Sequence, residues 1–143
     1  MLSLKSYRTL AYLGLIPFLV FTYQTWCGPI EDVRASTRAF LIFSACALVF
    51  ISGCWWGISF SEAGNPKVAM MLIGLSFALA AAFVTAYFSP MWAAISLGLG
   101  HFGIWILEFL IPDLRMEHSY RIQRTLLTMT LVVCHALVTI QFL

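Results

Sequence analysis

Three ionisable side chains, His101, Glu108 and His135, lie inside long apolar stretches of this 143-residue chain. Such groups are costly in the hydrocarbon of a membrane, where they usually hold a cofactor, carry protons or pair with one another. Counted from the inner ends of their expected helices at about 1.5 Å per residue, the two histidines differ in height by roughly 3 Å. They are therefore predicted to face each other near the middle of the membrane.

Two facing histidines allow three kinds of chemistry, and the sequence leaves all three open. They could share hydrogen bonds between helices as neutral imidazoles, relay protons, or ligate the iron of a haem b. The first is the expectation, with no cofactor, because a haem needs a large clear space between helices. Glu108 lies near the inner end of its helix, where we expect a structural ion pair with Arg115 or contact with water.

Motifs that support catalysis are missing from the sequence. It contains no His-Glu-x-x-His, no Gly-x-Ser-x-Gly, no Walker loop and no carboxylates at metal-ligand spacing. The 4 cysteines show no Cys-x-x-Cys spacing, which predicts neither a disulfide framework nor a zinc site. We therefore expect no catalytic residues, no metal and no enzyme activity.

Two groups of glycines are predicted to pack helices together. Gly98, Gly100 and Gly103 match the dinucleotide-binding pattern Gly-x-Gly-x-x-Gly, but that fingerprint needs a preceding strand and a solvated helix start. Inside an apolar helix they instead let another helix approach. Gly53 and Gly57 are four residues apart and share one helix face, a spacing typical of close helix contacts.

The elements that position these residues are membrane-spanning helices. Hydrophobic residues form 62% of the chain and charged residues 10%, far from the balance of a soluble domain. Breaks in the apolar pattern predict about five spans, each near the roughly 20 residues that cross a bilayer. The expected spans are 9–26, 39–60, 68–88, 91–110 and 125–143, and the polar links are 27–38, 61–67 and 111–124.

This pattern predicts an all-α membrane bundle that forms a single domain over residues 1–143. Residues 89–90 make a tight hairpin between the third and fourth spans, and residues 120–124 are expected to begin the last helix. Of the 8 basic residues, six would lie on one side of the membrane and two on the other. The richer side is the inner one, which places the N-terminus inside and the C-terminus outside.

The location and partners follow from charge and composition. A net charge of +2 gives little support for nucleic-acid binding. Without a long N-terminal stretch rich in arginine and serine, a bacterial inner membrane is preferred, with the mitochondrial inner membrane as the alternative. The expected partners are the lipid bilayer and other integral membrane subunits.

Three stretches resemble an uncharacterised multipass membrane family, a domain-of-unknown-function group that includes the mitochondrial transmembrane protein sixty-nine. They are residues 14–18 with the sequence Gly-Leu-Ile-Pro-Phe, residues 51–60 with Gly53, Trp56 and Gly57, and residues 120–128 with Tyr120, Arg121, Arg124 and Thr128. Trp55 departs from the pattern, because members of the family often have a histidine there. The resemblance implies a multipass inner-membrane protein without an assigned reaction.

The family stretches also suggest a binding surface at the inner face. Trp56, Tyr120, Arg121 and Arg124 fall on the same predicted side of the membrane, where arginines can hold anionic headgroups or the edge of a partner protein. The leading functional hypothesis is an accessory or assembly subunit of a larger, possibly respiratory, membrane complex. The alternatives are a haem- or quinone-binding redox subunit that uses His101 and His135, and a small oligomeric transporter.

Overall fold

The protein is a bundle of α-helices in which consecutive helices run antiparallel. The computed structural model describes residue 9 and residues 11–61, 68–110 and 118–143. Its helices are α2 (Ile16–Cys27), α3 (Ile30–Ser61), α4 (Val68–Tyr87), α5 (Pro90–Leu110) and α6 (His118–Ile140). The predicted all-α membrane bundle is confirmed: of the helices in the described ranges, α3, α4, α5 and α6 are long and apolar enough to cross a membrane.

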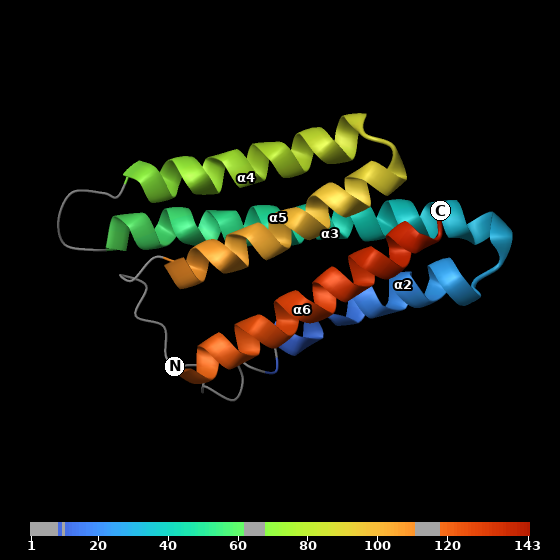
Figure 1. The fold of residues 1–143 in the computed structure, drawn as a ribbon, viewed down its shortest axis with the longest axis horizontal. Helices are drawn as coiled ribbons and strands as arrows, with labels where there is room; N and C mark the ends of the chain where they lie inside the picture. Colours follow the sequence, from blue (N-terminus) through green and yellow to red (C-terminus); the bar gives the residue numbers. More distant parts are fainter. Residues whose placement is uncertain (1–8, 10, 62–67, 111–117) are drawn as a thin grey trace.

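Helix α3 is the centre of the bundle. It is 32 residues long and packs against α2, α4 and α5, while α6 packs against α5 and α2. Figure 1 shows α4 at one edge of the bundle and the pair α2 and α6 at the opposite edge, with α3 and α5 between them. Side chains from α3, α5 and α6 therefore meet in the interior.

The first predicted helix, over residues 9–26, is interrupted. Residues 11–13 are helical, Gly14 and Leu15 form a turn, and α2 begins at Ile16 with Pro17 in its first turn. Proline has no N–H group, and its ring clashes with the carbonyl four residues earlier, so a continuous helix through this point is disfavoured. Consequently α2 has 12 residues and is about 18 Å long, short of the roughly 30 Å hydrocarbon core.

The predicted loop over residues 27–38 is wrong for most of its length. Only Gly28 and Pro29 separate α2 from α3, which begins at Ile30. Glu31 and Asp32 lie in the first turn, where their negative charge favours the positive end of the helix dipole. At 32 residues α3 is about 48 Å long, so its polar first turns can stay helical outside the hydrocarbon core.

The predicted boundaries of α4 and α5 lie close to the observed ones, whereas α6 begins seven residues before the predicted start at residue 125. Helices α4 and α5 fall within one residue of the predicted spans, and Pro90 is the first residue of α5, where its missing N–H costs nothing. Helix α6 begins at His118, so the end of the predicted polar link 111–124 is helical. Residues 111–117 lie outside the described ranges.

Glycines on α5 and α4 allow neighbouring helices to approach closely. A methyl group on Gly98 would lie 3.0 Å from Cβ of His135, and one on Gly100 would lie 2.7 Å from Cδ2 of Leu48. Gly103 faces Phe77 at 3.5 Å, an ordinary contact distance. Gly74, which the sequence reasoning did not single out, lies so close to α3 that a methyl group would be 2.8 Å from the carbonyl oxygen of Ser52.

Gly53 and Gly57 are different: the structure does not place either at a contact between helices of this chain, since an added methyl group would meet no described atom within 4 Å.

Candidate functional site

Polar side chains form a stripe on the inward faces of three helices. Residues three or four positions apart share a helix face, and this spacing places several polar residues of each helix in the interior. They are Ser44 and Ser52 on α3, His101 and Glu108 on α5, and Arg124, Thr128 and His135 on α6, all buried. Lipid offers no hydrogen bonds, and all of these side chains except Thr128 have a hydrogen-bond partner among the described residues.

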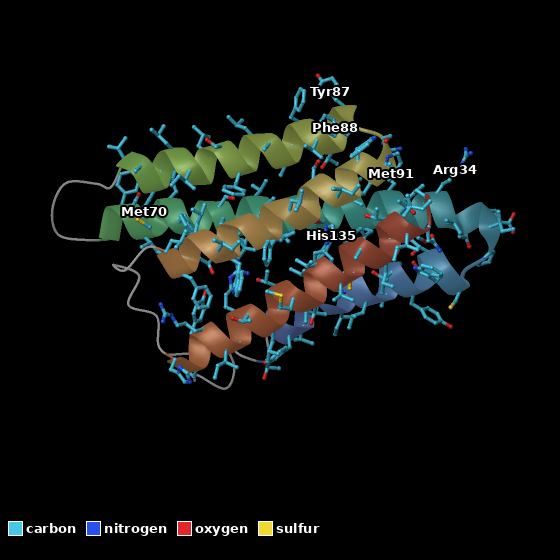
Figure 2. All side chains as sticks on the ribbon, in the orientation of Figure 1. Arg34, Met70, Tyr87, Phe88, Met91 and His135 are labelled. Atoms are coloured by element: carbon cyan, nitrogen blue, oxygen red, sulfur yellow. The ribbon has the colours of Figure 1, made fainter. Side chains whose placement is uncertain are left out.

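Ser44 of α3 joins His101 of α5 and His135 of α6. Its Oγ lies 3.2 Å from Nε2 of His101 and 2.8 Å from Nε2 of His135. The imidazole rings are 5.6 Å apart between centroids, and Figure 2 labels His135 where α6 meets α5 and α3. The structure thus brings together the two histidines that the sequence predicted to face each other.

The hydrogen-bond partners determine the direction of each bond when both rings are neutral. Nδ1 of His135 is 2.8 Å from the carbonyl oxygen of Leu131, which can only accept, so Nδ1 carries the proton. Nε2 of His135 must then accept from the Ser44 hydroxyl, and Ser44 accepts in turn from Nε2–H of His101. Nδ1 of His101 is left as a buried acceptor with no partner among the described residues.

This order favours shared hydrogen bonds over proton transport. A proton that moved along the chain toward His135 would end at the Leu131 carbonyl oxygen, which does not bind a proton at neutral pH. The aromatic rings of Phe18 and Phe40 also pack against the cluster. The ring centroids of Phe40 and His135 are 4.8 Å apart, and those of Phe18 and His101 are 6.4 Å apart. The cluster is therefore enclosed by apolar groups.

The histidine pair does not fit a haem b. Axial ligation would require both Nε2 atoms to point at one iron with a porphyrin between the rings. Here the Ser44 hydroxyl lies between the two Nε2 atoms, and Phe18 and Phe40 fill the flanks. Across the described ranges, no group of three or more His, Cys, Asp or Glu residues is placed to hold a metal ion either.

A buried ion pair forms the second polar cluster. Nε of Arg124 is 2.8 Å from Oε2 of Glu108, and Nη2 of Arg124 is 3.1 Å from Oε1. Nε1–H of Trp55 adds a longer bond of 3.4 Å to Oε1. Glu108 on α5 is therefore held by Arg124 on α6. The partner expected from the sequence, Arg115, lies outside the described ranges.

A cavity adjoins the ion pair and extends toward the histidine cluster. Its volume is about 420 Å³, within the range of small-molecule sites. One end holds Glu108, Arg124, Tyr120 and Gln123, and apolar side chains from α2, α3 and α6 form most of the wall. Phe18 and Leu131 line the cavity and also contact the histidine cluster, so they separate the two.

The sequence predicts that Trp56, Tyr120, Arg121 and Arg124 share one surface, but the structure does not bring them together on one. Arg124 is buried in the ion pair, and Trp56 is 47% exposed on the outside of α3. The Arg121 guanidinium lies 5.2 Å from the centre of the Phe109 ring, and Tyr120 lines the cavity. Tyr120 and Arg124 are four residues apart and share the face of α6 that lines the cavity, whereas Arg121 lies beside α5 and Trp56 lies on the exposed face of α3.

Sequence reasoning missed Ser44 and Trp55, the two α3 side chains that complete the polar clusters. A signal was present: Ser44, Ser52, Trp55 and Ser59 recur at helical spacing on one face of an apolar helix. Serine is common in membrane helices, however, and a hydroxyl can bond the carbonyl four residues earlier, as Ser52 does with Leu48. Ser44 differs only because α5 and α6 bring histidines to it.

The sequence, compared with known proteins, matches a family model. The family model described as "Protein of unknown function (DUF3429)" matches residues 4–140. Neither the search of curated proteins nor the search of solved structures found a match.

The ion pair predicts a strong, non-additive effect on stability. Arg124→Leu should lower the free energy of unfolding by about 3–5 kcal/mol, because it leaves the Glu108 carboxylate buried without its cation. Glu108→Leu combined with Arg124→Leu should cost less than the sum of the single changes. Denaturant titration in detergent micelles measures all three. Arg121→Leu is the control, expected to cost about 1 kcal/mol or less, and strictly additive losses at Glu108 and Arg124 would contradict the pairing.

The hydrogen-bond order predicts opposite tautomers for the two buried histidines. Long-range proton–nitrogen NMR spectra of histidine-labelled protein should show His135 protonated on Nδ1 and His101 protonated on Nε2. Spectra of His101→Gln and His135→Gln assign the signals. Ser44→Ala should leave the His135 tautomer unchanged, because the Leu131 carbonyl still fixes it, and should alter the Nε2 signal of His101. A proton on Nδ1 of His101 in the wild type would refute the deduced order.

Proposed function

Since the chain belongs to the DUF3429 family, whose function is unknown, we propose its role from its geometry: an accessory or assembly subunit that packs against other helices of a larger inner-membrane complex. A respiratory complex is the first candidate to test, and a bacterial inner membrane is the preferred location. The proposal rests on one observation, the open glycine face of α3.

Gly53 and Gly57 are the glycines of α3, and no described atom lies within 4 Å of a methyl group added to either. Glycine inside a helix costs about 1 kcal/mol relative to alanine. At Gly74, Gly98 and Gly100 that cost accompanies a close contact with a neighbouring helix. At Gly53 and Gly57 the described part of the chain supplies no such contact, and a helix of another subunit would.

The surroundings of the two glycines suit a helix rather than a soluble partner. Phe50, Trp56 and Phe60 are exposed on the same helix, 74%, 47% and 63% respectively. Small residues between large apolar ones form a shallow groove in which two helix backbones can approach closely. We therefore infer that the partner presents a membrane-spanning helix.

The proposed orientation places the N-terminus inside and the C-terminus outside. It rests on the uneven distribution of basic residues. It also agrees with the parallel course of α2 and α6: Trp26 donates to the carbonyl of Leu137, and Gln141 donates to the carbonyl of Thr25. The start of α2 and the end of α6 therefore lie at opposite ends of the bundle (Figure 1).

Replacing both outward glycines should release the partner without unfolding the protein. We expect Gly53→Leu with Gly57→Leu to reduce the co-purifying membrane subunits by about tenfold or more, which corresponds to about 1.4 kcal/mol of association. The measurement is mild-detergent purification of the tagged protein from its native membrane, with quantitative mass spectrometry. Unfolding stability of the isolated variant should not fall, because neither side chain meets another helix of the chain.

The matched control is Ala82→Leu with Ala86→Leu, two exposed small residues at the same spacing on α4. This pair should leave partner recovery unchanged. Wild-type protein that purifies only as a free monomer would refute the accessory-subunit proposal, as would equal losses in the two double variants.

Reporter fusions test the proposed orientation. Alkaline phosphatase fused after Leu143 should be active in a bacterial host, because the enzyme folds only outside the inner membrane, and green fluorescent protein at the same position should be dark. Green fluorescent protein fused before Met1 should fluoresce, because the N-terminus is proposed to lie inside. A fluorescent C-terminal fusion would contradict the orientation.

A further inference from the structure

Arg124 has hydrogen-bonding capacity beyond what the described residues use. A guanidinium carries five N–H donors, and the bidentate pair with Glu108 uses Nε–H and one hydrogen of Nη2. Among the described residues, none accepts a hydrogen bond from the other three. The side chain is 10% exposed and lines the cavity, so these donors lie in a nearly buried position next to empty space.

The net charge at this end of the cavity selects the kind of acceptor. Glu108 neutralises Arg124, and its carboxylate lies beside the unused donors. A bound anion would gain the donors but would be repelled by that carboxylate in a medium of low dielectric constant. A neutral carbonyl oxygen accepts the same hydrogen bonds without this repulsion.

The rest of the cavity suits an apolar body. Its wall includes Phe18, Ile51, Leu127 and Leu131, and it has a volume of about 420 Å³. The exposed side chain of Phe50 also lines it, so the cavity opens on the outside of the bundle. In a membrane that opening faces lipid, from which a lipid-soluble molecule can enter.

We propose that this cavity binds a neutral, carbonyl-headed amphipathic molecule, whose oxygen accepts hydrogen bonds from Arg124 and whose apolar part lies along α2, α3 and α6. The carbonyl can come from a quinone ring or from the ester of a membrane lipid. Phe18 and Leu131 separate the site from His101 and His135, and the site borders the proposed subunit contact at Phe50.

The test compares three probes on purified protein in micelles of a detergent without carbonyl groups. The probes are a fully substituted benzoquinone with a decyl chain, a glycerol mono-oleate ester, and dodecyl phosphate as the anion. A probe that binds should raise the midpoint of thermal unfolding by about 9 °C at a hundredfold excess over its Kd. Titration of this shift gives the affinity of each probe.

Two variants locate the binding. Ala47→Phe places a ring in the cavity from α3 and should weaken binding at least tenfold, whereas Ala80→Phe on the exposed face of α4 should leave it unchanged. Glu108→Gln with Arg124→Gln keeps a neutral hydrogen-bonded pair but removes the guanidinium, and it should also weaken binding about tenfold or more.

Both carbonyl probes belong to the proposed class, and their relative affinities identify the source. Tighter binding of the benzoquinone indicates a quinone ligand, and tighter binding of the ester indicates a membrane lipid. The proposal is overturned if dodecyl phosphate binds more tightly than both, if neither carbonyl probe shifts the midpoint, or if Ala47→Phe binds as the wild type does. None of these outcomes depends on whether a partner subunit co-purifies.

Discussion

The bidentate pair of Glu108 and Arg124 is nearly buried, with side chains that are 5% and 10% exposed. Leaving one of them alone would cost several kcal/mol, so α5 and α6 must meet at the height that joins them. Trp55 adds a third donor from α3 to the same carboxylate. One ion pair thereby fixes the relative positions of three helices, and the histidine cluster farther along the same faces follows from that alignment.

The requirement for hydrogen-bond partners explains why the interior contains polar and small residues together. Gly98 and Gly100 bring α5 close enough to α6 and α3 for His101 to reach Ser44, which also bonds His135. A larger residue at Gly98 would push against His135 itself, because a methyl group there would lie 3.0 Å from its Cβ. Close helix packing and the polar cluster are therefore two consequences of the same glycines.

Helix α3 presents different chemistry on its different faces. Its inward face supplies Ser44 and Trp55 to the polar clusters, and Ile51 lines the cavity. Gly53 and Gly57 lie on the outward face. A partner helix bound at those glycines would run beside Phe50, whose side chain borders the cavity, so the proposed subunit contact and the proposed ligand site would be neighbours.

The sequence by itself determined the helical membrane architecture, because long apolar runs separated by polar breaks have one stable form in lipid. It also located α4 and α5 within one residue and the height of the two histidines, since the rise per residue of a helix is constant. It could not extend α3 back to Ile30, because polar residues at a helix start and in a loop look alike. Only the tertiary structure decided that Arg124 is buried against Glu108, that Ser44 joins the histidines, and that Gly53 and Gly57 face outward. These facts depend on the rotation of each helix about its axis, which is set by the neighbouring helices and leaves little trace in a nearly uniform apolar sequence.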